Sequence, residues 1–178
     1  AGYGAVPEAT FHGAAGVISG LGDTNLRIDA VDAFAVTARM FCNFATGSDG
    51  SEMNVVELLK QLSELYRAAL NLPTAWADDV SGGDDAIDGL TTGMDLVLNR
   101  ARALPVSIYW TFFDPFTTSD PVCGAISDDV SDIFLDIARG LAYFDSNRKA
   151  DARYHWAWHF QYHWGEHAVG AMRALHNY

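Results

Sequence analysis

Apolar side chains recur every three or four residues along most of this chain, and this spacing is the strongest constraint on its fold. In segment 29–45, Phe34, Ala38 and Phe41 fall on one side of a helix, and Gly47 follows as a stop signal. The same period recurs in 54–72, 90–104, 127–144 and 146–176. Helices of this kind bury their apolar stripes against one another. The sequence therefore predicts an all-α, single-domain bundle of about five helices with a long C-terminal helix.

Signals at the helix ends support these boundaries. Asn54 is suited to cap the second helix, and Glu57 three residues later completes a capping box. Ser127 is suited to cap the fourth helix. The positive end of the helix dipole favours the acidic side chains of Asp128 and Asp129 in its first turn. We expect the second and last helices to lie at the centre of the bundle.

Three segments fall outside the helical pattern. Residues 1–28 are rich in glycine and small side chains, which disfavour a stable helix, so we predict an N-terminal arm outside a 29–178 helical domain. The apolar run 108–113 is ambiguous between a strand and a buried helical turn. Because no second strand-like run exists to pair with it, we expect a helix-to-loop element. The acidic stretch 77–89 lacks the ligand spacing of an EF-hand, so we predict a solvated loop.

Charge and composition exclude several classes of partner. The formal net charge is −12, so this acidic chain repels nucleic acid and anionic membrane surfaces. No apolar run approaches the roughly 20 residues that a membrane-spanning helix needs. The start of the chain also lacks the pattern of a signal peptide, and we expect a cytoplasmic location. Cys42 and Cys123 lie far apart without a paired motif, and we predict two buried free thiols.

Four histidines follow one another at intervals of four in the last predicted helix: His155, His159, His163 and His167. Imidazoles one helical turn apart can hold one metal ion together. The run from His163 to His167 also matches the His-x-x-Glu-His pattern of inverzincin proteases, in which two histidines bind zinc and the glutamate is the general base. A third ligand has to come from elsewhere, and the acidic candidates are Glu52, Glu57, Asp114 and Asp132.

The position of each histidine relative to the core depends on an uninterrupted helix. With Trp164 at the centre of the buried face, His163 and His167 lie beside the core, whereas His155 points away from it. His163 and His167 are therefore the candidate ligands for zinc or another divalent metal. The competing interpretation is that the ring nitrogens bond to buried carboxylates or carbonyls. A third hypothesis is a pH sensor, since neighbouring imidazoles gain charge at roughly pH 6.

Large aromatic rings alternate along the same segment between residues 154 and 164. A lone surface helix does not expose rings on every side, so this helix is expected either at the centre of the domain, against another subunit, or beside a small-molecule pocket. The candidate binding surface consists of Trp164, Trp158, Tyr162, His159, Asp114 and Tyr109.

Three runs of residues resemble a bacterial family known only as domain of unknown function 5063. They are Trp156-Ala-Trp-His-Phe-Gln-Tyr-His-Trp-Gly-Glu-His-Ala168, Leu62-Ser-Glu-Leu-Tyr-Arg-Ala-Ala-Leu-Asn-Leu-Pro73 and Tyr109-Trp-Thr-Phe-Phe-Asp-Pro-Phe116. The resemblance extends from about residue 29 to the C-terminus and implies a small all-helical cytoplasmic domain without an assigned activity. The positions that match its pattern are His163, Trp164, Gly165, His167, Tyr66, Pro73, Asp114 and Pro115. Glu166, His155 and His159 are not among them.

Two functions follow as hypotheses. The first is a non-catalytic helical domain that binds another protein or itself as a homodimer, without a cofactor, because the sequence contains no complete catalytic constellation. The alternative is a metal-binding protein or metal-dependent hydrolase with His163 and His167 as ligands and Glu166 handling protons.

Overall fold

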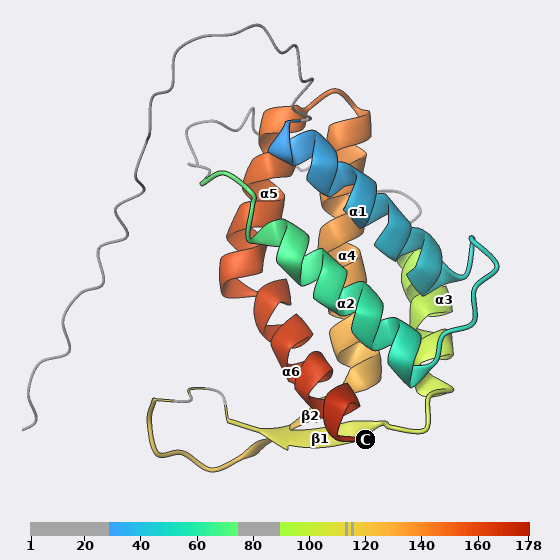
Figure 1. Ribbon diagram of the computed structural model, residues 1–178, viewed down its shortest axis with the longest axis vertical. Helices are drawn as coiled ribbons and strands as arrows, with labels where there is room; N and C mark the ends of the chain where they lie inside the picture. The colour runs from blue at the N-terminus through green and yellow to red at the C-terminus, as the bar shows by residue number, and fades with distance from the viewer. Residues whose placement is uncertain (1–28, 75–89, 113, 115) are drawn as a thin grey trace, which may run out of the picture.

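The computed structural model describes residues 29–74, 90–112, 114 and 116–178. These residues form a helical bundle with one small two-stranded sheet (Figure 1), which confirms the predicted all-α class. In chain order the elements are α1 Ala30–Thr46, α2 Val55–Ala69, α3 Leu90–Arg102, β1 Ile108–Thr111, β2 Val122–Ala125, α4 Ile126–Asp145, α5 Lys149–Tyr162 and α6 Trp164–Asn177. The predicted glycine-rich arm, 1–28, and the predicted acidic loop, 77–89, lie outside the described residues.

Local signals fix the starts of the first two helices and the end of α1 within one residue of the predicted positions, whereas α2 ends at Ala69, three residues before the predicted end. The Asp29 carboxylate accepts a hydrogen bond from the Val31 N–H at 2.8 Å and caps α1. Gly47 ends α1 with a φ of 79°, a left-handed conformation that suits glycine. The Asn54 side chain accepts from the Glu57 N–H at 3.0 Å and caps α2, as predicted.

The central helix of the bundle is α4, not the second and last helices as predicted. It packs against α1, α3, α5 and α6, and Figure 1 shows it behind α1 and α2. Gly140 brings α5 unusually close, because a Cβ there would lie 2.0 Å from Trp156 Nε1. The Trp156 indole N–H donates to the Ile137 carbonyl at 3.1 Å. The indole N–H edge of this α5 tryptophan thus contacts the middle of α4.

Segment 108–113 was predicted as a helix-to-loop element, and this prediction was wrong. Its first residues form β1, which pairs antiparallel with β2 so that Ile108 lies opposite Ala125 and Thr111 opposite Val122. The partner strand is short and rich in small residues, so it lacks the alternating pattern that signals a strand. Because β2 continues directly into α4, this helix starts at Ile126, before the predicted Ser127 cap. Figure 1 shows the hairpin across the lower end of the bundle, beside α6.

The predicted long C-terminal helix is two helices, because the backbone leaves the helical conformation at His163, with φ −147° and ψ −89°. Gly165 permits this break, since a Cβ there would lie 2.0 Å from the Phe160 carbonyl oxygen. The break changes the direction in which later side chains point. The predicted order of burial was therefore wrong: the His155 side chain is 9% exposed and that of His163 is 45% exposed.

Burial also corrects two smaller predictions. Trp164 was predicted to belong to the candidate binding surface, but it is completely buried, and its indole N–H donates to the Trp156 carbonyl at 3.3 Å. Cys123 is exposed rather than buried, whereas burial raises the pKa of the Cys42 thiol to about 12. None of the helices in the described residues combines the length and apolar character that crossing a membrane requires.

Candidate metal centre

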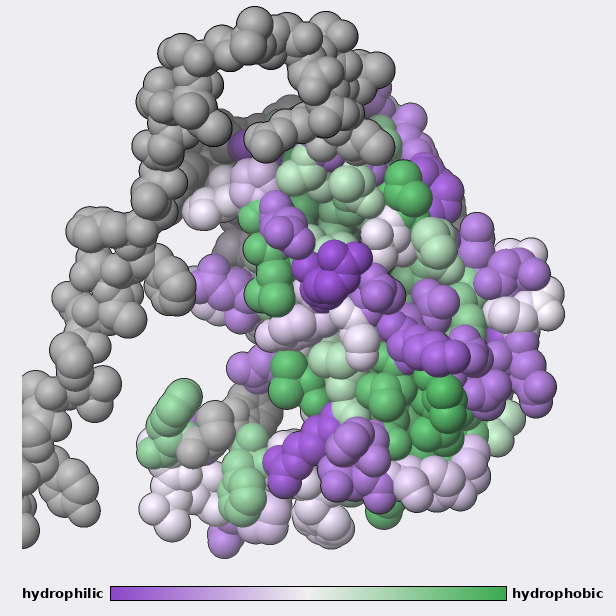
Figure 2. Space-filling model, viewed as in Figure 1, coloured by the Kyte–Doolittle hydropathy of each residue, from purple (hydrophilic) through white to green (hydrophobic). Residues whose placement is uncertain are grey.

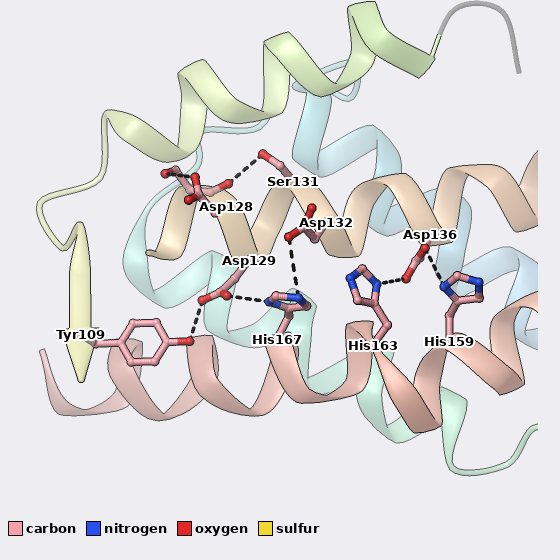
Figure 3. A network of polar contacts seen from close by, with 10 residues as sticks. Tyr109, Asp128, Asp129, Ser131, Asp132, Asp136, His159, His163 and His167 are labelled. Atoms are coloured by element: carbon pink, nitrogen blue, oxygen red, sulfur yellow. Dashed lines mark hydrogen bonds and ion pairs between the residues drawn. The ribbon is translucent and has the colours of Figure 1, made fainter. Parts of the chain in front are cut away.

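A row of carboxylates on α4 faces a row of imidazoles on α5 and α6. Asp129, Asp132 and Asp136 are separated by three and four residues, so their side chains lie on one face of α4. Figure 3 shows them alternating with His167, His163 and His159 along the space between the helices. We call these six residues, together with His155, the Asp–His row.

Asp129 holds both Tyr109 of the hairpin and His167 of α6. The Tyr109 hydroxyl donates to Asp129 Oδ2 at 2.8 Å, and His167 Nδ1 lies 2.8 Å from Asp129 Oδ1. The other ring nitrogen of His167, Nε2, faces Asp132 Oδ2 across 3.7 Å, which is too long for a hydrogen bond. Asp129 therefore fixes the orientation of an imidazole whose second nitrogen faces a carboxylate.

Asp136 is the acceptor at the other end of the row. Its Oδ2 lies 2.6 Å from His163 Nδ1, and its Oδ1 lies 3.0 Å from His159 Nδ1. His155 Nε2 is 3.9 Å from the same Oδ1 atom. Each oxygen of this one carboxylate thus faces a different part of the histidine series.

Burial makes the row costly for the fold. Asp129 and Asp136 are 4% and 6% exposed, respectively. His155 Nε2 and His159 Nδ1 are shielded from solvent and have no hydrogen-bond partner among the described residues. A buried polar group left without a partner costs about 1–3 kcal/mol. Unlike the apolar core, this part of the bundle is not explained by stability.

The surroundings shift several pKa values in the row. Burial, with smaller contributions from His159 and Arg139, lowers the pKa of His155 to about 4, so this imidazole is neutral at pH 7. The Asp129 hydrogen bond raises the pKa of His167 against the opposing effect of burial. Burial raises the pKa of Asp132. Burial also acts to raise the pKa of Asp136, but its contacts with His159 and His163 outweigh that effect and the net shift is downward.

Within the described residues, two sets of three side chains have the composition and proximity that a metal ion needs. The first set is Asp132, His163 and His167, and the second is Asp136, His155 and His159. In each set, one potential ligand atom per residue lies within 4.8 Å of the others. Tetrahedral zinc with bonds of about 2.0–2.2 Å spaces its ligand atoms roughly 3.3–3.6 Å apart, so modest side-chain adjustment brings either set to coordination distance.

The structure brings the two predicted ligands, His163 and His167, together with one of the predicted acidic partners, Asp132. The other acidic candidates are not in this set: Glu57 pairs with Lys60 at 2.8 Å, and Asp114 accepts from the Phe116 N–H. The inverzincin pattern loses its premise, because His163 lies at the helix break and Glu166 is exposed. What remains of that prediction is a candidate metal site without the protease geometry.

The other predicted binding residues do not form one surface. Trp158 and Tyr162 are 45% and 60% exposed on α5, with ring centroids 5.2 Å apart. His159 instead lies partly buried within the Asp–His row, and Tyr109 lies partly buried at its end, bonded to Asp129. Asp114 is an exposed residue beyond β1.

Three residues of the row escaped the sequence analysis as site residues: Asp129, Asp136 and His155. Asp129 was assigned only to the helix dipole, and His155 was placed opposite the core. A usable signal was present, because the acids of the fourth helix repeat at three and four residues and the histidines repeat at four. Two packed helices with such matching series bring the acids and the imidazoles face to face.

The fold and the site together define a small helical-bundle protein with an internal row of carboxylates and imidazoles. The chain belongs to the family described as Domain of unknown function (DUF5063), whose model matches residues 27–178. The crystal structure of protein BF1032 from Bacteroides fragilis is similar, with a TM-score of 0.62 and 22% sequence identity over 84% of this chain and 92% of that one. At this identity the likeness concerns the fold alone. No match was found among curated proteins.

Proposed function

We propose that this protein binds a divalent transition-metal ion, with Asp132, His163 and His167 as ligands. The observation that carries the proposal is the orientation of His167. Its Nδ1 is held by buried Asp129 at 2.8 Å, while Nε2 faces Asp132 at 3.7 Å. Metal-binding histidines usually bond through their other ring nitrogen to a carboxylate or carbonyl, which fixes the ring and makes it a stronger ligand.

The mixture of nitrogen and oxygen ligands indicates the kind of ion. Imidazole suits zinc and related transition metals, whereas calcium and magnesium prefer oxygen ligands alone. Three protein ligands leave a tetrahedral ion with one open position, as in catalytic rather than structural zinc sites. The bundle has a large apolar core of its own, so the ion is not needed to fold the chain. These features favour an ion that binds a further ligand at its open position, rather than an ion that stabilises the fold.

The test uses the full chain purified without chelator and analysed by native mass spectrometry, before and after removal of metal and addition of zinc. We expect bound zinc in the unmodified protein and its loss in a His163→Ala, His167→Ala variant. His176→Ala is the matched control, because this histidine of α6 is exposed and belongs to neither set of ligands. A protein that takes up no zinc at micromolar concentrations overturns the proposal.

A specific observation also favours the first functional hypothesis, in which the protein binds a protein partner. Ile108 and Trp110 of β1, and Phe112 directly after it, alternate along the chain and are 60%, 64% and 49% exposed, so they form an apolar ridge on one face of the hairpin. Figure 2 shows some pale-green, moderately hydrophobic side chains at the lower left of the molecule, among white and purple ones. Exposed apolar patches commonly mark protein interfaces. We infer a second candidate function, binding of another protein or of a second copy through this ridge.

Sedimentation of the purified chain tests that candidate directly. A dimer that dissociates in a Trp110→Ala, Phe112→Ala variant supports self-association through the ridge. A dimer that persists in the variant contradicts it. Trp158→Ala is the control, because this exposed tryptophan lies on α5 and not on the hairpin.

A further inference from the structure

His155 is a buried imidazole, and one of its ring nitrogens has no hydrogen-bond partner among the described residues. Only 8% of the residue is exposed, and its Nε2 atom has no hydrogen bond within the part of the chain that the structure describes. Two neighbouring rings pack against the His155 ring. The Tyr143 ring meets it edge-on with centroids 5.8 Å apart, and the His159 ring centroid lies 4.1 Å away. Buried polar atoms normally have a bonding partner. An unbonded Nε2 atom that faces Asp136 therefore indicates a ligand between the two residues.

His159 presents a second nitrogen to the same place. Its Nδ1 is 3.0 Å from Asp136 Oδ1, yet the ring is not aligned for a hydrogen bond, and this atom too is shielded from solvent. His155 Nε2 faces the same oxygen at 3.9 Å. Two imidazoles from successive turns of α5 and one carboxylate oxygen of α4 therefore converge on one point.

We propose that Asp136, His155 and His159 form a second divalent-metal site beside the first. A cation at this point accepts the lone pairs of both ring nitrogens that lack hydrogen bonds and neutralises a buried carboxylate. The ligands differ from those of the proposed function, so the two proposals can fail separately. Asp136 connects the sites, because its Oδ1 faces the second set while its Oδ2 holds His163, a ligand of the first.

The chemistry of the site suits zinc or cobalt rather than a proton or a water molecule. A water molecule is the competing occupant, since it can hydrogen-bond to the same nitrogens. It does not, however, offset the buried negative charge of Asp136.

The experiment is a cobalt(II) titration of the full, metal-free chain, followed by visible absorption and by native mass spectrometry. We expect two ions per chain in the unmodified protein and one in a His155→Gln, His159→Gln variant. The reciprocal variant, Asp132→Asn with His167→Gln, also retains one ion, now in the second site. His176→Gln is the control and retains two ions.

The single variant His159→Gln guards against a folding defect from the buried position, since the His159 side chain is 24% exposed. This variant is expected to reduce the affinity of the second site for its ion by more than the roughly 10- to 100-fold that the loss of an outer-shell partner costs. One ion in the unmodified protein and an unchanged titration in this variant overturn the second site and leave the first intact. No ion in any form overturns both, and water is then the occupant.

Discussion

Two helix interfaces of the same bundle follow opposite rules. Where α1 and α2 meet the core, the side chains are apolar and completely buried, as with Ala38, Phe41 and Leu62. Where α4 faces α5 and α6, the bundle instead buries Asp129, Asp136 and His155. Apolar burial contributes about 25 cal/mol per Å² to the stability of the folded state, so stability alone explains the first interface. The second removes polar groups from water without pairing all of them.

The proposed metal sites would account for this difference. Replacing buried charged groups by well-packed apolar residues is often neutral or stabilising, so a buried carboxylate–imidazole row is not the most stable solution for this position. Its retention is understandable if the row meets a ligand. Variants that separate stability from metal binding test this contrast most directly.

The largest expected effect lies where the two interfaces meet, at Trp156. Its ring packs against Phe34 of α1, with centroids 4.9 Å apart, and its N–H bonds to Ile137 of α4. Trp156→Ala is expected to lower the free energy of unfolding by about 3–5 kcal/mol, measured by urea denaturation. Half-exposed Trp158→Ala serves as the control and should change it far less. Equal effects from both variants would contradict the packing described here.

Metal binding should stabilise the polar interface next most strongly. Zinc at about 100 times its Kd is expected to raise the free energy of unfolding by about 2.7 kcal/mol, because the ion binds the folded state only. Thermal unfolding with zinc and then with excess chelator measures this gain and its reversal. The His163→Ala, His167→Ala variant should lose the gain due to the first site. A gain that is unchanged in this variant places the ion elsewhere.

Asp129 should affect affinity without being a ligand of either set. Asp129→Asn weakens the hold on His167 Nδ1 and is expected to reduce zinc affinity about 10- to 100-fold, measured by competition with a chromophoric chelator. The matched control is Asp128→Asn, since this neighbouring residue is exposed and bonds only to Ser127 among the described contacts. If the two variants bind zinc equally, Asp129 does not position the imidazole.

The smallest expected effect is at the end of the row. Tyr109→Phe removes the hydroxyl that donates to Asp129 at 2.8 Å while leaving the ring in place. The free energy of unfolding should fall by about 1 kcal/mol, as for a typical side-chain hydrogen bond. Urea denaturation measures the loss, and Tyr178→Phe, at an exposed ring, provides the baseline. A loss no greater than that baseline would mean that the hydrogen bond contributes nothing measurable.

The parts of this structure that sequence predicts are those fixed by near neighbours. Asp29, Gly47 and Asn54 act within a few residues of their own position, and the two ends of α1 and the start of α2 were correct. His163 and His167 were also recognisable, because their spacing is local. The hairpin was not recognisable, because β2 is short and the glycine in it reflects a contact with a residue far away in the sequence. A Cβ at Gly124 would lie 2.5 Å from the Tyr109 ring.

The candidate site was only half predictable for the same reason. Its imidazoles follow from spacing, but which of them are buried depends on the break at His163. That break depends on the close approach of Gly165 to the Phe160 carbonyl and on the burial of Trp164, which are packing events. An ideal helical wheel averages over such interruptions and so placed His155 on the wrong side.

The single residue between α5 and α6 has a mechanical consequence. His163 joins two rigid rods, and its side chain is held by α4 through Asp136. An imidazole at a joint, when pinned to a third rod, sets the angle between the other two. An ion bound to His163 would fix the angle between α5 and α6. Any force that bends α6 against α5 would then change the geometry of the ligands around the ion. If the proposed ion binds, its affinity and the stiffness of this joint would therefore depend on each other.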